Sequence, residues 1–328
     1  MRILVAGAGG VGGTVAGALA RAGVPFVLME KDAGSLDAMG EGGLELIEGG
    51  ASRRLEVTAV SPARLEGSFD AVFLAVKGPR LGEVMRAASP HMHRDTFFVP
   101  LQAGWAVDLL AEMVEEKRVL PGLAEFHARR SGPGRVEMIS SGTLVVGELD
   151  GRETPRLAEL RELFSGGVPG FLRVSANIAG RAWWTMRLSA CLGPLGALAG
   201  SDLGGEEVPE GLWKAVAPLW DELEDLARLE GVELEPALPE DNPGPLLRAA
   251  APYAASLLED LDRGEPLERD LTAGFLLRRA ERLGAGTPAL SSLHSLLREA
   301  EAGRRAPSPA ALREFSRRLE EERGLSLM

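Results

Sequence analysis

The first 175 residues alternate short apolar runs with polar and glycine-rich segments. Apolar runs of four to six residues bounded by turn residues are typical of buried strands. Between the first two runs, Val11, Val15 and Leu19 recur on one helical face, and Gly23 ends a helix predicted over Val11–Ala22. The predicted strands are Ile3–Ala6, Pro25–Glu30, Leu44–Ile47, Leu55–Val60, Ala71–Val76, Thr96–Leu101, Arg118–Leu120, Thr143–Glu148 and Phe171–Ser175.

After Ser175 the strand pattern gives way to helical periodicity. Proline stands in the first turn of several segments, where its missing N–H costs little. The predicted helices are Ile178–Ala199, Pro209–Glu230, Pro245–Leu261, Pro266–Leu283, Pro288–Glu301 and Pro307–Arg323. We therefore expect two domains, an α/β domain over residues 1–176 and an all-helical domain over 177–328. A cleft between them is the default place for a ligand.

A Gly-x-Gly-x-x-Gly motif lies between the first strand and the first helix, at Gly7, Gly9 and Gly12. The first glycine permits a tight turn, the second lets backbone approach a pyrophosphate, and the third allows close helix–strand packing. The helix N-terminus then offers free N–H groups to the phosphates. The motif predicts a Rossmann-like dinucleotide site, with cofactor contacts from Gly7, Ala8, Gly9, Gly10, Val11 and Gly12.

Charged residues after two strands bear on the choice of cofactor. Glu30 comes 18 residues after Gly12, where an acid can accept from a ribose 2′-hydroxyl and favours NAD. The adjacent Lys31 favours NADP, because it can pair with a 2′-phosphate. Lys77 ends another strand, at the edge of the sheet where ligands bind. All three could instead be solvated residues.

The overall charge excludes some classes of partner. The chain has 36 basic and 48 acidic side chains and a formal net charge of −12, which argues against nucleic acid or an anionic membrane as the main partner. Neither a signal peptide nor an apolar run of membrane-spanning length is evident. We therefore expect a cytoplasmic protein with a small-molecule substrate.

Cysteine and histidine give no sign of a metal site. The single cysteine, Cys191, lies in an apolar helical stretch and is expected in the core. His91 and His93 form a His-x-His, but their surroundings read as a polar loop without a third ligand. We therefore predict no bound metal.

Taken together, these segments resemble the ketopantoate reductases, NADPH-dependent enzymes of pantothenate synthesis in the 6-phosphogluconate-dehydrogenase-like group. The resemblance spans about residues 1–300. It rests on Gly7–Gly13, Ala75–Lys77, Leu101–Gly104, Pro133–Val136, Gly142–Gly147, Trp183, Pro194–Leu195, Ser256–Asp260, Glu268 and Gly274. It implies NADP(H) rather than NAD(H) as cofactor and reduction of a carbonyl.

The chain departs from this family at its catalytic positions. The family carries a lysine two residues after the tryptophan as the general acid, where this chain has Thr185. Substrate-binding asparagines of the family fall on Ser189 and Gly193, and a further asparagine falls on Ala103. No lysine occurs between Lys117 and Lys214, so a shifted alignment does not restore the acid.

Other residues retain or could replace these functions. The resemblance assigns the family's substrate-side serine and glutamate to Ser256 and Glu268, and Tyr253 shares a predicted helix face with Ser256. His127 follows the predicted strand at Arg118–Leu120 and could donate a proton near neutral pH, although an exposed loop histidine is the simpler interpretation.

Two functions follow from these patterns. The first is an NAD(P)H-dependent oxidoreductase with an altered site, which reduces a 2-oxo acid, a related carbonyl or an imine, with the helical domain serving substrate binding and dimerisation. The second is a cofactor-binding sensor or interaction protein that has lost catalysis.

Overall fold

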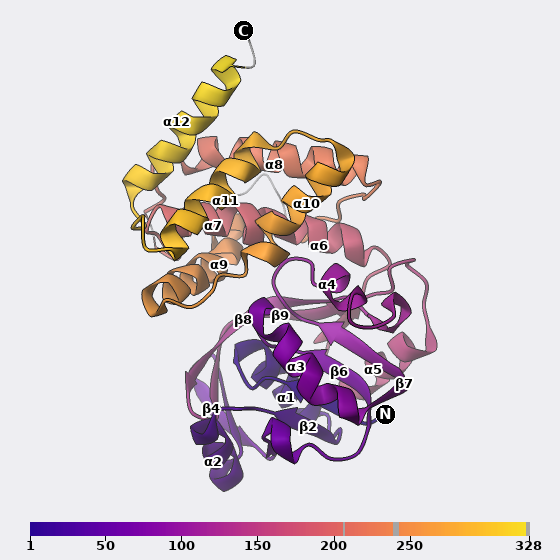
Figure 1. Ribbon diagram of the computed structural model, residues 1–328. Helices are drawn as coiled ribbons and strands as arrows, with labels where there is room; N and C mark the ends of the chain where they lie inside the picture. Colours follow the sequence, from indigo (N-terminus) through magenta and orange to yellow (C-terminus); the bar gives the residue numbers. More distant parts are fainter. Residues whose placement is uncertain (206, 239–242, 326–328) are drawn as a thin grey trace. The chain divides into compact units, whose positions relative to one another are not determined.

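The computed structural model describes residues 1–205, 207–238 and 243–325, and its chain forms two compact units (Figure 1). One unit contains Met1–Gln102 and Ala106–Ile178, and the other contains Ala103–Trp105 and the chain from Ala179 onward. The short segment Ala103–Trp105 is the exception to a division near residue 176, because it packs with the helices although it follows a strand of the first unit.

The first unit is built on a five-stranded parallel sheet with the strand order β5-β2-β1-β6-β7. Its strands are β1 (Ile3–Ala6), β2 (Phe26–Met29), β5 (Thr58–Val60), β6 (Phe69–Leu74) and β7 (Met92–Pro100). Its helices are α1 (Gly10–Arg21), α2 (Ala33–Gly42), α3 (Leu81–Ala88), α4 (Val107–Ala111) and α5 (Pro155–Ser165). This arrangement confirms the Rossmann-like fold, since β1, α1 and β2 form the expected unit.

A second, mixed sheet belongs to the same unit. Its strands are β3 (Leu44–Glu48), β4 (Ala51–Leu55), β8 (Gly122–Gly132), β9 (Arg135–Val146) and β10 (Leu172–Val174). Helix α1 packs on both sheets: its Val15 and Leu19 are fully buried, and a Cβ at Gly13 or Gly17 would crowd Val136 of β9 or Leu46 of β3. Small residues on that face therefore let the second sheet approach the helix.

Several strand predictions need correction. The run Leu55–Val60 is divided between β4 and β5, and Met92–Asp95 extends β7 rather than forming a loop. The strand predicted at Arg118–Leu120 is instead the end of a 3₁₀ turn followed by an isolated bridge from Val119 to Phe98, and β8 begins at Gly122. Met92 pairs with Phe69, and the polar residues 93–95 follow it at the more exposed start of a strand whose apolar part is buried. Apolar patterning identifies only that buried part.

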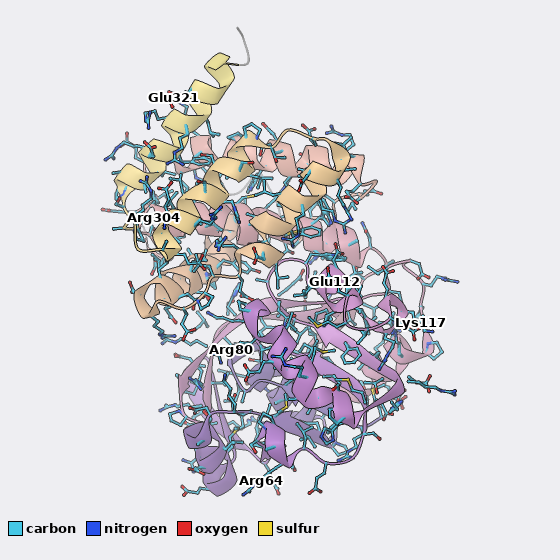
Figure 2. The ribbon with its side chains drawn as sticks, in the orientation of Figure 1. Arg64, Arg80, Glu112, Lys117, Arg304 and Glu321 are labelled. Carbon is cyan, nitrogen blue, oxygen red and sulfur yellow. The ribbon has the colours of Figure 1, made fainter. Side chains whose placement is uncertain are left out.

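The second unit is helical. Its elements are α6 (Ile178–Met186), the π-helix η5 (Arg187–Leu192), α7 (Gly193–Leu198), α8 (Leu212–Leu229), α9 (Pro243–Arg263), the 3₁₀ turn η6 (Arg269–Leu271), α10 (Ala273–Leu283), α11 (Pro288–Glu301) and α12 (Pro309–Leu325). In the described part of the chain, no helix is long and apolar enough to cross a membrane. Figure 2 shows charged side chains such as Lys117 and Glu321 pointing outward from the ribbon.

Two predicted helices are interrupted. The helix predicted over Ile178–Ala199 contains η5, which ends two residues before Pro194. Proline lacks an N–H and its ring collides with the carbonyl four residues earlier, so a wider turn is a common accommodation. The helix predicted over Pro266–Leu283 begins only at Ala273. By contrast, α11 has its predicted bounds, and the Glu222 carboxylate accepts the N–H groups of Ala289 and Leu290 at its start.

Candidate functional site

The glycine motif forms the loop between β1 and α1. Gly7 has φ +105°, a conformation that side chains disfavour, and a Cβ there would lie 2.9 Å from the Ala75 carbonyl oxygen. A Cβ on Gly12 would overlap the Gly7 carbonyl oxygen. A Cβ on Gly9 would meet no atom within 4 Å, so this position faces open space.

The start of α1 is suited to an anion. Its N-cap is Gly9, no side chain caps it, and its first intrahelical bond runs from Gly13 N–H to Gly9 oxygen. The preceding N–H groups of the first turn therefore have no partner within the helix. Together with the space beside Gly9, this cradle fits a pyrophosphate. No side chain of Ala8 or Val11 blocks it, since Ala8 is buried beneath the loop and Val11 packs against the core.

Strand β8 crosses the start of α1. A Cβ on Gly10 would overlap the Ala128 carbonyl oxygen, so the two backbones are in close contact. This crossing places the segment from His127 to Arg130 beside the cofactor cradle. Sequence reasoning missed Arg130 because a β8 residue has no local pattern that relates it to the glycine motif.

Glu30 ties the end of β2 to the glycine loop. Its Oε2 accepts the Ala8 N–H at 2.8 Å, and its Oε1 accepts the N–H groups of Lys31 at 2.7 Å and Asp32 at 2.9 Å. The Lys31 ammonium lies 3.5 Å from Glu83 Oε1, and the Arg130 guanidinium lies 3.7 Å from Asp32 Oδ1. These two ion pairs are half-exposed.

Gln102 braces the sheet edge at which Lys77 lies. Its Nε2 donates to the carbonyl oxygens of Leu74 at 2.8 Å and Val76 at 2.7 Å, although the side chain is almost fully buried. Lys77 follows this edge and is exposed at the start of a 3₁₀ turn. Sequence reasoning used Gln102 only as part of the family pattern and missed this bracing role.

His127 lies within β8, so the loop interpretation was wrong. The pairing of β8 with β9 is irregular on both sides of this residue. Burial lowers the pKa of His127 to about 4, because desolvation disfavours the charged imidazolium. The ring is therefore neutral at neutral pH, which removes the imidazolium as a ready proton donor.

In the helical unit, Ala103 lies beside the turn that follows Glu268. The N–H of Trp105 donates to the Leu271 carbonyl oxygen at 2.8 Å. Gly104 has φ +84°, and a Cβ on it would overlap the same oxygen. Trp105 also packs on Phe275, with ring centroids 6.4 Å apart. The strand-end segment is thereby joined to η6.

A second set of contacts holds the chain on both sides of Glu268. The Glu301 carboxylate of α11 accepts the Leu267 N–H at 2.9 Å and also binds the Arg269 guanidinium, through Nε at 2.9 Å and Nη2 at 2.5 Å. Arg269 Nη1 lies 3.1 Å from His294 Nε2. Glu268 itself is half-buried, and its carbonyl oxygen accepts from Thr272 Oγ1 at 3.1 Å.

The positions of the family's lysine and of two of its three asparagines lie on α6, η5 and α7. The Thr185 hydroxyl donates to the Arg181 carbonyl oxygen at 2.9 Å, and the buried Ser189 hydroxyl lies 3.5 Å from the Thr185 carbonyl oxygen. A Cβ on Gly193 would lie only 2.7 Å from Tyr253 Cβ of α9. Ser256 lies one turn beyond Tyr253 and is half-buried.

The expected core residue Cys191 is fully buried, and burial raises the pKa of its thiol. His91 Nδ1 lies 2.9 Å from the Gly67 carbonyl oxygen, and His93 Nε2 lies 3.0 Å from Asp70 Oδ1. These two histidines therefore have separate partners.

The parallel sheet, the uncapped glycine loop and the helical second unit define a two-unit dinucleotide-binding protein of the Rossmann type. Family profiles described as "Ketopantoate reductase PanE/ApbA" and its "C terminal" match residues 3–151 and 177–301. The chain belongs to the ketopantoate reductase family, which comprises NAD(P)H-dependent oxidoreductases.

Individual relatives cover nearly the whole chain. The Bacillus subtilis "Uncharacterized oxidoreductase YkpB" is 29% identical over 92% of this chain and 99% of its own. The crystal structure of a PanE/ApbA family ketopantoate reductase from Ralstonia eutropha JMP134 is 28% identical, with a TM-score of 0.75, and covers 93% of this chain and 99% of its own. A D-mandelate dehydrogenase in complex with NADH and anilino(oxo)acetate shares the fold at 21% identity, with a TM-score of 0.77 over 92% of this chain and 99% of its own.

Proposed function

We propose that this protein is an NAD(P)H-dependent oxidoreductase that reduces the carbonyl or imine of a small substrate other than ketopantoate. Membership of the family supports the reaction type. The observation that carries the proposal is the uncapped start of α1 beside the open space at Gly9, because this cradle suits the pyrophosphate of a dinucleotide.

The chain's own residues would bind and orient the cofactor. The N–H groups of Gly9–Gly12 would hold the pyrophosphate, while the Ala8 N–H stays bound to Glu30 beside it. Glu30 and Lys31 would contact the adenosine ribose. Lys77 and Ala103 are proposed to complete the cofactor site. When bound, the nicotinamide supplies the hydride.

A reduced carbonyl also needs a proton at its oxygen. Glu268 is the proposed donor: as a neutral carboxylic acid it would give its proton to that oxygen and become a carboxylate. It matches the family's substrate-side glutamate, and Glu301 anchors the backbone on both sides of it. Thr185 and His127 are weaker proposals. The Thr185 hydroxyl already donates to Arg181, and a neutral imidazole donates a proton less readily than an imidazolium.

The substrate site is proposed to bind fewer polar groups than the family's usual site. Ala103, Ser189 and Gly193 occupy the positions of three asparagines, and Gly193 is packed against Tyr253. Ser256 and Tyr253 would supply the remaining hydroxyls. A substrate that lacks the hydrogen-bonding groups of ketopantoate fits this change.

Oxidation of NADH and NADPH should be followed with a panel of 2-oxo acids, aldehydes and imines. We expect at least one substrate to be turned over, and Glu268→Gln to lower its kcat while leaving the melting temperature of the free protein nearly unchanged. Glu299→Gln on α11 is a matched control that should keep full activity, because Glu299 pairs with Arg305 and Arg318 instead. Full activity of Glu268→Gln would contradict the role of Glu268.

A second candidate is a cofactor-binding sensor or interaction protein without catalysis. The simultaneous replacement of the family's lysine and three asparagines favours it. Saturable dinucleotide binding with no turnover across the panel would identify this function.

The assembly and location of the protein remain predictions. A homodimer formed through the helical unit would be detected by light scattering coupled to size-exclusion chromatography. A cytoplasmic location would be checked by cell fractionation.

A further inference from the structure

We propose that Glu30 makes the site selective for NAD(H) over NADP(H), which reverses the preference expected from Lys31 and the family. The inference rests on the proposed function, since it requires the glycine loop to bind a nicotinamide dinucleotide. The two cofactors differ only at the adenosine ribose, where NAD(H) has a 2′-hydroxyl and NADP(H) has a phosphate. The deciding contacts are therefore those at the end of β2.

The Glu30 carboxylate is held in one position by three backbone N–H groups. One of them belongs to Ala8 in the glycine loop, so the carboxylate lies directly beside the proposed pyrophosphate cradle. The other two belong to Lys31 and Asp32, and both bind the same oxygen, Oε1. Moving the carboxylate aside for a phosphate would break contacts to both the loop and the strand end.

This arrangement leaves an acceptor suited to a hydroxyl. A carboxylate offers about four lone-pair positions, of which these three N–H groups use two on Oε1 and one on Oε2. The remaining position is on Oε2, the oxygen bound to the glycine loop. A ribose hydroxyl can donate to it. A phosphate that is largely ionised at neutral pH cannot, and it would meet a negative charge.

The nearby cations do not offset this negative charge. Lys31 lies against Glu83, and Arg130 lies near Asp32. Hydrogen bonds from Ser35 hold the pKa of Asp32 below its ordinary value, so this carboxylate stays ionised at neutral pH. Together with Glu30, these side chains carry three negative charges (Glu30, Asp32 and Glu83) and two positive charges (Lys31 and Arg130). A 2′-phosphate would add about 1.5 to 2 more negative charges.

The test measures dissociation constants of the full-length protein for NADH and NADPH by isothermal titration calorimetry at fixed ionic strength. ADP-ribose and 2′-phospho-ADP-ribose serve as redox-inactive probes of the same difference. We expect NADH and ADP-ribose to bind about tenfold or more tightly than their phosphorylated counterparts. Lys31→Ala should weaken NADPH by less than about threefold, because the Lys31 ammonium is already paired with Glu83.

Two variants test whether Glu30 and the surrounding charges cause the preference for NADH. Glu30→Gln should weaken NADH binding and reduce the preference, but it also alters the contacts to the loop. Glu83→Gln leaves those contacts intact and releases Lys31, so NADPH affinity should rise severalfold while NADH affinity stays constant. Glu48→Gln is the matched control, because Glu48 pairs with Arg21 at 2.7 Å and should affect neither affinity.

The measurements distinguish a failure of the proposed selectivity from a failure of the proposed function. Equal or tighter binding of NADPH by the unmodified protein would overturn the selectivity. A preference that is unchanged in both Glu30→Gln and Glu83→Gln would overturn its assignment to Glu30 and the surrounding charges. Binding of neither dinucleotide at millimolar concentration would overturn the proposed function itself.

Discussion

At the scale of single residues, the glycines of the β1–α1 loop and of the start of α1 are needed for different structural reasons. Gly7 adopts a positive φ, and Gly12 contacts the loop that precedes it. Gly10 contacts β8. Gly9 differs because the space beside it is open, which is the property that a ligand contact requires.

Gly9→Val should therefore separate binding from folding. A branched Cβ would intrude on the cofactor cradle, so saturable NADH and NADPH binding should be lost up to millimolar concentration. The free energy of unfolding should fall by no more than about 2 kcal/mol, the cost of a poor N-cap residue, since Gly9 has an extended conformation with no neighbour within 4 Å. Calorimetry and urea unfolding measure both quantities. Gly12→Ala is the comparison: it should lower the free energy of unfolding more than Gly9→Val, because its Cβ would overlap the Gly7 carbonyl oxygen. Equal destabilisation by the two variants would contradict the view that the space beside Gly9 serves a ligand rather than the fold.

His127 should make stability depend on pH. Its pKa is about 4 in the folded protein and near 6.5 when exposed, so the unfolded chain takes up a proton first as the pH falls. Keeping His127 neutral therefore contributes to the free energy of unfolding. This contribution is fully present above pH 6.5 and is lost as the pH falls from 6.5 to 4, by up to about 3 kcal/mol. Urea unfolding over this range should show a smaller loss for His127→Gln than for the unmodified protein. His91→Gln is the control, and an identical pH profile for His127→Gln would refute the prediction.

At the scale of elements, the π-helix η5 and α7 carry two of the replaced positions. Their contact with α9 is close because Gly193 has no side chain where Tyr253 approaches. An asparagine at residue 193 would require α9 to move. The proposed alteration of the substrate site would therefore change helix packing as well as side chains.

Gly193→Ala should destabilise the helical unit by about 1–3 kcal/mol, because its Cβ would lie 2.7 Å from Tyr253 Cβ and 3.0 Å from the Leu188 carbonyl oxygen. Thermal unfolding monitored by circular dichroism would measure the effect. Ser189→Ala on the preceding π-helix η5 should cost less than about 1 kcal/mol, because among the described residues its hydroxyl makes a single long contact, 3.5 Å to the Thr185 carbonyl oxygen. Similar stability of Gly193→Ala and the unmodified protein would show that α9 can adjust freely.

At the scale of the whole molecule, the cofactor cradle and the substrate-side residues belong to different units. Ala103–Trp105 is the part of the strand-rich sequence that packs with the helices, and it does so beside the turn after Glu268. In the proposed reaction, the first unit therefore binds the cofactor, and the helical unit binds the substrate and supplies the proton. Replacing the lysine affects only the second of these tasks.

Turnover of ketopantoate should consequently be at least about a hundredfold below that of a lysine-bearing family member. A positioned general acid contributes about 10²–10⁴ in rate, or roughly 3–5 kcal/mol of barrier, and three substrate-binding amides are replaced as well. Steady-state assays with both NADH and NADPH test this. Ordinary turnover of ketopantoate would contradict the prediction and would direct attention to another proton donor, with His127 tested first.

Local patterns in the sequence determined much of the fold. The β1–α1 unit, the change from strands to helices and the bounds of α11 all depend on residues within a few positions of one another, so apolar spacing, glycines and prolines identify them. The same motif predicted the dinucleotide cradle and, with the other family segments, the family. Weakly apolar α2 and the polar start of β7 escaped this reasoning because their side chains are largely exposed.

Only the tertiary structure decided what depends on contacts between distant residues. It revealed that Gly13 and Gly17 face a second sheet, that Glu30 binds the glycine loop and that Lys31 is paired with Glu83. It also joined Ala103–Trp105 to the helical unit. The sequence showed that an acid and a lysine compete to read the ribose, but their charges act through partners 22 and 52 residues away along the chain. No local pattern encodes those distances, because they are set by how the elements pack.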